Sequence, residues 1–209
     1  MKNKNKNNIN KIYNRSKNFA EFSSNYFDYL KKVFQNIDLN SINKIENDFN
    51  QLRLRKKTIF VIGNGGAAAT AITMANDLGF DILKKTNTKK TFKISSLNDN
   101  NSVITAIAND TGYENIFINQ LKIHYQKGDA LVILSASGNS PNLIKAARWV
   151  RDQKGKVIGI LGFSGGKVKK YCNTLIHIKT NSGEYGPVED LQLIFNHLLA
   201  HWFQNKIKR

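Results

Sequence analysis

Residues 58–79 have the sequence TIFVIGNGGAAATAITMANDLG, which predicts a strand, a glycine-rich turn and an Ala-rich helix in that order. The first five residues are apolar or β-branched, as is typical of a parallel strand covered on both faces. Four similar runs follow, namely TFKIS (91–95), ALVILSA (130–136), KVIGILG (156–162) and TLIHI (174–178). Helical stretches alternate with them, at about 67–79, 102–108, 113–126, 141–153 and 188–205. The alternation predicts an α/β fold, a three-layer sandwich around a mainly parallel five-stranded sheet.

The part of the chain that precedes this pattern has a different character. Apolar residues at near-helical spacing predict two N-terminal helices, at 19–36 and 41–54. Residues 1–18 hold five Lys and one Arg and no acidic residue. We therefore expect a basic, flexible tail at 1–18, a helical arm at 19–55 that packs on the domain and in an oligomer, and the sheet domain at 56–209.

The formal charge of +17 is the unusual figure of the composition, with 32 Lys and Arg against 15 Asp and Glu. Nucleic-acid binding is one interpretation of such a balance. It is disfavoured, because the basic residues lie in tails and loops and no basic stripe interleaved with aromatic residues accompanies them. A solvated surface explains the charge more simply, and a basic field would also attract a small anionic substrate.

The remaining composition excludes several classes of protein. One cysteine, Cys172, leaves no disulfide scaffold and no cysteine-built metal cage. No apolar run approaches the roughly 18 residues that a membrane-spanning helix needs, and the N-terminal residues lack the apolar stretch of a secretory signal. We expect a soluble, cytoplasmic protein without a membrane partner.

The first loop that could bind a ligand is Gly63-Asn64-Gly65-Gly66, at the end of the strand 58–62. Ligands bind at the carboxyl ends of strands in such sheets, and glycines let backbone N–H groups approach them closely. A simple tight turn is the alternative. The loop does not match the dinucleotide fingerprint, because the sixth position is Ala68, and the chain lacks the nucleotide P-loop pattern. We expect no nucleotide cofactor.

The second loop is SASGNS, residues 135–140, followed by Pro141 at the start of a helix. Three hydroxyl groups and the unpaired N–H groups of a helix N-terminus form a neutral cradle rich in hydrogen-bond donors. An ordinary N-cap needs only one hydroxyl. The loop therefore predicts a phosphate site.

Four segments in this order, GNGGAAATAITMANDLGF, ANDTGYENIF, LSASGNSPNLIKA and GPVEDLQLIFNHLL, resemble a SIS (sugar isomerase) domain. Within that superfamily the chain is most similar to the phosphoheptose isomerases, over about residues 20–205. The resemblance implies the SIS fold and an isomerase that interconverts sedoheptulose 7-phosphate and a D-glycero-D-manno-heptose 7-phosphate-type aldose through an enediol, as part of heptose biosynthesis. It also implies a homotetramer with active sites at the subunit interfaces.

The resemblance further implies roles for single residues. The phosphate is held by Ser135, Ser137 and Ser140, helped by the amide of Ala136. The sugar is contacted by Asn64, Gly65, Gly66, Asn109 and Asp110, and by Glu189, which stands where the family usually has Gln. The two proton transfers fall to Asp77 and His197. In zinc-containing members the equivalents of Asp77, Glu189 and His197 ligate the metal together with a second histidine.

Three positions depart from the family pattern. Asp77 replaces the usual Glu, Thr73 replaces the second histidine, and Ala67 replaces a common Ser. The departures leave two hypotheses open, an isomerase, with or without zinc, and a non-catalytic SIS module that binds a sugar phosphate or serves as a protein adaptor.

The chemistry of the residues is coherent on its own. Aldose–ketose isomerisation needs a base for a carbon-bound proton and a group that shuttles a hydroxyl proton, and a carboxylate with a histidine suits both tasks. Asp77 and Thr73 share one helix face, and so do Glu189 and His197. Without the resemblance, His197 would be interpreted as a partly buried structural histidine and Glu189 as a first-turn acid. We expect the other three histidines to be structural or solvated, namely His124, His177 and His201.

Overall fold

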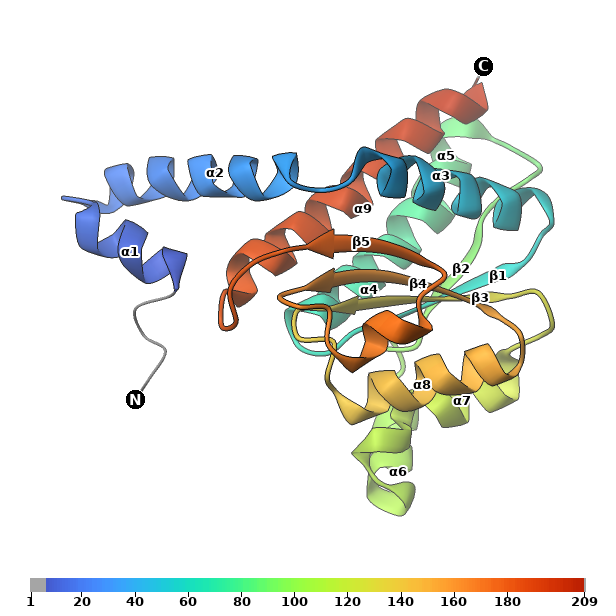
Figure 1. Ribbon diagram of the computed structural model, residues 1–209. Helices are drawn as coiled ribbons and strands as arrows, with labels where there is room; N and C mark the ends of the chain where they lie inside the picture. Colours follow the sequence, from blue (N-terminus) through green and yellow to red (C-terminus); the bar gives the residue numbers. More distant parts are fainter. Residues whose placement is uncertain (1–6, 209) are drawn as a thin grey trace.

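A computed structural model describes residues 7–208 and contains one five-stranded parallel sheet (Figure 1). The strands are β1 (Thr58–Ile62), β2 (Lys93–Ser96), β3 (Ala130–Ser135), β4 (Lys156–Gly162) and β5 (Thr174–Ile178), in the order β2-β1-β3-β4-β5. β1 and β3 are neighbours, with Ile62 opposite Ile133. The loops that follow these two strands therefore leave the sheet at the same edge. The α/β fold class predicted from the sequence is confirmed.

Helices cover both faces of the sheet and make the sandwich. Successive residues of β1 point to opposite faces, so that Ile59 and Val61 join one apolar core while Phe60 and Ile62 join the other. The first core is completed by α3 (Leu39–Leu54), α4 (Gly66–Asn76) and α9 (Tyr185–Lys208), and the second by α7 (Ile116–His124) and α8 (Pro141–Asp152). The chain's apolar strands are buried on both sides, as their composition predicts.

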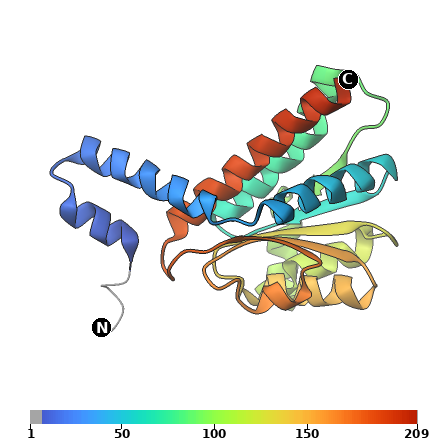
Figure 2. The ribbon, with the colours of Figure 1, turned by 45° about the horizontal axis from the view of Figure 1, so that its top comes forward.

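The N-terminal arm extends away from the sheet (Figures 1 and 2). It consists of α2 (Phe19–Gln35), at the predicted place, and of α1 (Asn8–Arg15), which was not predicted. The prediction of a flexible tail was wrong for residues 8–15. The side chain of Asn7 caps α1 by accepting from the backbone N–H groups of Ile9 and Asn10, and Ile12 is buried with 3% of its surface exposed. Residues 1–6 lie outside the described part of the chain.

The helix after β1 is longer than its sequence pattern suggests. α4 continues into the π-helical turn η2 (Asp77–Asp81) and then α5 (Ile82–Thr86), whereas the pattern ends at residue 79. Asp77 therefore does not stand at the end of the helical segment but at the start of a π-helical turn within it. Such turns occur mostly as single bulges in α-helices and are frequent at functional sites.

The other boundaries differ by a few residues. α6 (Asn101–Thr111) extends past the predicted 102–108, and the short 3₁₀ turn η3 (Tyr113–Asn115) separates it from α7. A second 3₁₀ turn, η4 (Lys167–Tyr171), lies between β4 and β5. α9 starts at Tyr185, so that Pro187 lies inside the first turn of the helix rather than before it. None of the helices in residues 7–208 has the length and apolar character that a bilayer crossing requires.

Candidate functional site

The glycine loop (residues 63–66) and the serine loop (residues 135–140) meet at the carboxyl edge of the sheet. The side-chain amides of Asn64 and Asn142 pair through two hydrogen bonds of 3.0 and 2.9 Å. Tyr113 adds a third bond, since its hydroxyl donates to Asn64 Oδ1 at 3.1 Å. Because Asn142 belongs to the first turn of α8, this network joins the glycine loop to the helix that the serine loop starts.

The serine loop keeps its hydroxyl protons free for a ligand. Ser135 Oγ accepts from the N–H of Gly138 at 3.0 Å, and Ser137 Oγ accepts from the N–H of Asn139 at 3.2 Å. A hydroxyl that accepts such a bond still has its own proton to donate. Ser140 is the N-cap of α8, and its side chain makes no capping hydrogen bond. The loop therefore offers three hydroxyl donors in front of the positive end of a helix dipole, which suits an anion.

The loop that follows β4, residues 163–168, packs against the serine loop and is called the supporting loop. Gly138 has φ +63°, and a side chain there would collide with the backbone carbonyl of Gly165. Its own carbonyl accepts from the N–H of Val168 at 2.9 Å, and Asn139 Oδ1 accepts from the N–H of Lys167 at 3.0 Å. These contacts fix the loop's shape without using its hydroxyl groups.

Two polar side chains contact the glycine loop, Asn98, which the sequence analysis did not single out, and Glu189, which it did. Asn98 bridges the backbone of Gly63, accepting from its N–H at 3.1 Å and donating to its carbonyl at 3.0 Å. The carboxylate of Glu189 lies where a Cβ of Gly66 would be, so that only glycine leaves it room. Burial, and after it the charge of Asp190, raises the pKa of Glu189 above its ordinary value.

Asp77 and His197 lie close together where the π-helical turn after α4 packs against α9. The distance between Asp77 Oδ2 and His197 Nε2 is 3.8 Å, with the Asp77 side chain 16% exposed and the His197 side chain 51% exposed. Asn196 donates to Asp77 Oδ2 at 2.7 Å, and Asn76 donates to Asp77 Oδ1 at 3.1 Å. A carboxylate and an imidazole, both in reach of solvent, are thus side by side.

Glu189 does not join this pair within one chain. It precedes His197 by eight residues of α9, which corresponds to about 12 Å of helix. Gly66, which Glu189 faces, is 11 residues before Asp77, or about 16 Å along the helix. The expectation that Asp77, Glu189 and His197 form one group is corrected for a single chain.

The described residues of one chain do not by themselves assemble a zinc site. Among residues 7–208 there is no group of three or more His, Cys, Asp or Glu side chains that could hold a metal ion. Thr73, in place of the second histidine, turns its hydroxyl to the carbonyl of Ala69 at 3.0 Å. The chemistry below therefore uses no metal, and zinc stays an untested expectation.

The other residues predicted to contact the sugar do not belong to the pair formed by Asp77 and His197. Asn109 and Asp110 lie exposed on α6, where the amide of Asn109 donates to Asp110 at 2.8 Å (Figure 1). The side chain of Asn64 is engaged by Asn142 and Tyr113 rather than presented freely. Gly65 is exposed with φ +59°, and Ala136 is buried within the serine loop.

Of the remaining histidines, His201 follows His197 by one turn of α9, and the other two lie on other elements. His177 Nε2 bonds the carbonyl of Phe163 at 2.9 Å, and burial lowers the pKa of this histidine. His124 and His201 are exposed on α7 and α9.

Comparison with known proteins identifies the family. The family model described as "SIS domain" matches residues 25–162, about two thirds of the chain. The chain belongs to the SIS domain family. The chain is 36% identical over 149 residues to a phosphoheptose isomerase of Rhodospirillum rubrum, and this match covers 71% of this chain and 76% of the relative. It is 33% identical over 153 residues to a phosphoheptose isomerase of Aliarcobacter butzleri, with the same two coverages.

A solved structure gives the same fold for this SIS domain. The phosphoheptose isomerase of Neisseria gonorrhoeae superposes with a TM-score of 0.77 at 23% identity, covering 90% of this chain and 100% of that one. The resemblance stated from the sequence motifs is confirmed, and within the SIS domain family the chain groups with the phosphoheptose isomerases.

Proposed function

We propose that this SIS domain protein is an aldose–ketose isomerase that interconverts sedoheptulose 7-phosphate and a D-glycero-D-manno-heptose 7-phosphate-type aldose. The observation that carries the proposal is the pair formed by Asp77 and His197, 3.8 Å apart, in a chain more than 30% identical to proteins named phosphoheptose isomerase. The alternative of a non-catalytic adaptor is not favoured, since the relatives that the chain resembles over 71% of its length are named phosphoheptose isomerases.

The phosphate binds in the serine loop. The hydroxyl groups of Ser135, Ser137 and Ser140 donate to its oxygens, and the N-terminus of α8 supplies a favourable dipole. No lysine is needed there, so the large positive charge has at most a steering role for the anionic substrate.

The reaction takes place where Asp77 and His197 meet. In the aldose, the Asp77 carboxylate takes the proton from C-2, and the electron pair of that C–H bond forms the C-1=C-2 double bond of the enediol. His197 moves the hydroxyl proton from the oxygen of C-2 to that of C-1. Asp77 then returns its proton to C-1, which leaves the carbonyl at C-2. Atoms and electrons balance without an oxidant, and each proton-transfer group contributes roughly 10²–10⁴-fold.

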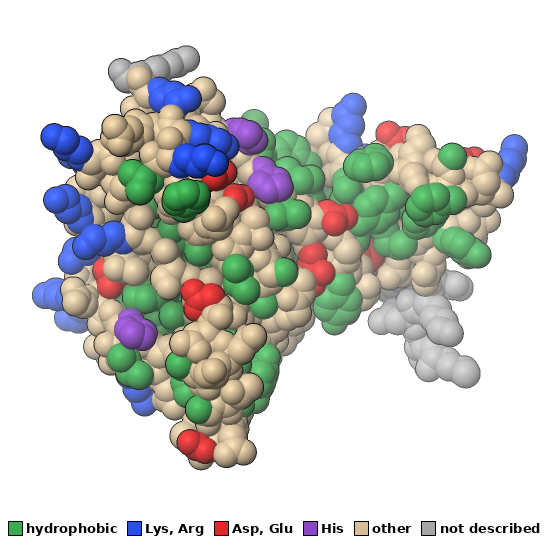
Figure 3. Space-filling view, turned by 180° about the vertical axis from the view of Figure 1, so that it is seen from behind, with side chains coloured by type: hydrophobic (Ala, Val, Ile, Leu, Met, Phe, Trp, Pro, Cys, Tyr) green, Lys and Arg blue, Asp and Glu red, His purple; other side chains and the backbone are tan. Residues whose placement is uncertain are grey.

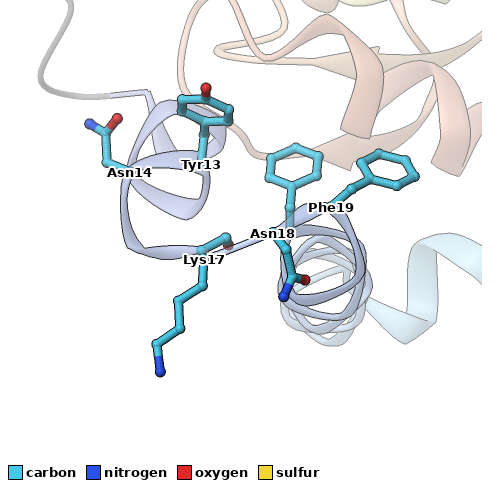
Figure 4. Close-up of a pocket in the computed structure, with 7 residues that line it drawn as sticks. Tyr13, Asn14, Lys17, Asn18 and Phe19 are labelled. Carbon is cyan, nitrogen blue, oxygen red and sulfur yellow. The ribbon is translucent and has the colours of Figure 1, made fainter.

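A homotetramer is part of the same proposal, and exposed apolar side chains support it. The arm presents Phe19, which is 81% exposed, and Phe27, and hydrophobic side chains line it in Figure 3. A hollow of about 610 Å³ lies where α1 turns into α2, with Tyr13 and Phe19 at its two sides (Figure 4). Light scattering at micromolar concentration tests this, and a monomer would refute it.

Exposed apolar side chains also lie near the reactive pair. Leu193 and Ile194 precede His197 by about one turn of α9, and Ile72 is exposed on α4. Leu198 and Trp202 are exposed on α9 as well and line a groove against α3. A second copy packed on this face would exclude water from the pair, which is why we place the active site at a subunit interface.

One assay series tests the function. Purified protein is offered five-, six- and seven-carbon sugar phosphates in deuterated water, with added Zn²⁺ and with chelator. We expect turnover with the seven-carbon substrate, deuterium incorporation at C-1 or C-2, and the same rate with chelator. Absence of exchange with every sugar phosphate would refute the isomerase, and activity only with Zn²⁺ would refute the metal-free chemistry. A cytoplasmic location stays a prediction that cell fractionation can test.

A further inference from the structure

Asn196 is one of three buried polar residues of α9, with Gln192 and Gln204. Its side chain is completely buried on α9, beside the π-helical turn that starts at Asp77. Its Nδ2 donates to Asp77 Oδ2 at 2.7 Å, while its Oδ1 is buried with no hydrogen-bond partner. A buried carbonyl oxygen without a partner costs free energy. Neither the sequence motifs nor the resemblance assigns a role to this residue.

We propose that Asn196 is a positioning residue that holds the Asp77 carboxylate in place for proton transfer. This inference rests on the proposed function, in which Asp77 is the base. Asn196 does not touch the substrate, and it acts through Asp77 alone.

The hydrogen-bond chemistry supports this role. An ionised carboxylate only accepts hydrogen bonds, so the amide must turn its NH₂ group to Asp77 and leave its oxygen unpaired. The bond is charge-assisted and fixes the oxygen that lies 3.8 Å from His197. The second donor, Asn76, binds the other oxygen from an exposed position. Asn196 is thus the buried anchor of the carboxylate.

The geometry also accounts for the short acid at position 77. Aspartate has one methylene group fewer than glutamate, so its carboxylate stays close to the helix that carries it. Consecutive residues of α9, Asn196 and His197, both reach the same Asp77 oxygen. In this arrangement the amide occupies the space that a longer acid would need.

Gln192 provides a matched control on the same helix. It is also completely buried, and its Oε1 also lacks a partner. Its amide, however, donates to the backbone carbonyl of Ile160 at 2.8 Å and not to Asp77. Loss of either amide removes one buried hydrogen bond, but only Asn196 is connected to the reacting groups.

The first experiment compares Asn196→Leu with Gln192→Met in the full-length protein. We expect Asn196→Leu to lower kcat by about 10- to 100-fold with less than a twofold change in KM, because a displacement of about 1 Å is enough for such a loss. Gln192→Met should lower Tm by a similar amount and keep kcat within twofold. Equal kcat losses in the two variants, or an unchanged kcat in Asn196→Leu, would overturn the proposal. If Asn196→Leu does not fold, Asn196→Ser takes its place.

The second experiment is a double-mutant cycle that uses the length of the acid. Asp77→Glu brings the longer carboxylate against the Asn196 amide, and Asn196→Ser makes room for it. We expect the double variant to retain at least about fivefold more kcat than the product of the single effects predicts. Additive effects would contradict a positioning contact between the two side chains.

A crystal structure of the Asn196→Leu protein separates this inference from the proposed function. If the wild-type protein exchanges no substrate hydrogen, the isomerase proposal fails by itself. The positioning role is then judged by the Asp77 carboxylate, which should move by more than about 1 Å relative to His197 when the amide is lost. A carboxylate that stays in place would refute the positioning role whatever the activity.

Discussion

The helix pair α4 and α9 has two ends that are built in different ways. At the start of α4, the glycine loop and the hydroxyl groups of the neighbouring serine loop form the proposed binding end, with Glu189 against Gly66. Further along, Asp77 and Asn196 form the reactive end with His197, although the first two are 119 residues apart in the chain. The binding end depends on local turn geometry, and the reactive end depends on how two helices pack.

This difference predicts that substitutions can change the substrate affinity and the rate of the reaction independently. A substitution at the binding end should change the affinity for the sugar phosphate, and one at the reactive end should change the rate of the bound substrate. The following predictions test that separation, from the largest expected effect to the smallest.

Asp77→Asn gives the largest expected effect. The amide keeps the shape of the side chain but cannot take a proton from carbon, so kcat should fall by about 10²–10⁴-fold. KM should change little because the serine loop remains intact. Steady-state kinetics and hydrogen exchange with deuterated water measure both quantities.

The control for this prediction is Asp81→Asn. Asp81 lies on the same π-helical turn and pairs with Lys85 at 3.3 Å on the surface. Such exposed pairs contribute about 0–1 kcal/mol, so kcat should stay within twofold. A loss of substrate affinity in Asp77→Asn that matches its loss of kcat would break the separation of the two ends.

Ser137→Ala tests the binding end. The lost hydroxyl donated to a charged phosphate, and such a bond contributes about 1.5–3 kcal/mol, so KM should rise by roughly 10- to 100-fold with kcat nearly unchanged. Inhibition by inorganic phosphate should weaken in the same proportion. Ser164→Ala is the control, since Ser164 Oγ accepts from the Gly166 N–H at 3.4 Å in the supporting loop and faces no predicted ligand. If kcat fell while KM stayed constant, the phosphate would not bind at Ser137.

The sequence predicted the binding end better than the reactive end. The alternating strands and helices indicate the parallel sheet, and glycines and serines at two neighbouring strand ends indicate an anion site, because these signals are local. The motif resemblance identified Asp77 and His197. Asn196, by contrast, is one of several polar residues of α9, and only the packing of α9 on the π-helical turn gives it its partner.

The helix that was not predicted and the separation of Glu189 from His197 within one chain have the same physical origin. The helix α1 lies in a Lys- and Asn-rich segment, and its first N–H donates to Glu184 Oε1 at 2.6 Å, a partner 176 residues away that no local pattern reveals. The proposed zinc ligands Glu189 and His197 share a helix face, but shared direction does not bring them together across about 12 Å of helix. Periodicity gives the direction of side chains and leaves their distances to the tertiary structure.

Glu189→Gln gives the smallest expected effect and tests whether Glu189 belongs only to the binding end. Burial and the charge of Asp190 raise the pKa of Glu189 in the folded protein, so its ionised form is less stable there than in the unfolded chain. Below the ordinary pKa of about 4.3, Glu189 is protonated in both states and does not lower the free energy of unfolding. As the pH rises from there through the pKa of Glu189 in the folded protein, the free energy of unfolding falls. The neutral amide avoids that loss.

Thermal unfolding across pH measures this effect. The Tm of Glu189→Gln should exceed that of the wild type slightly at pH 7, and the difference should shrink toward zero as the pH falls below about 4. Because Glu189 lies about 12 Å of helix from His197, the kcat of the variant should change far less than that of Asp77→Asn. A kcat loss as large as that of Asp77→Asn would mean that Glu189 takes part in the proton transfers after all, through a neighbouring subunit, and the two ends would then be one site in the oligomer.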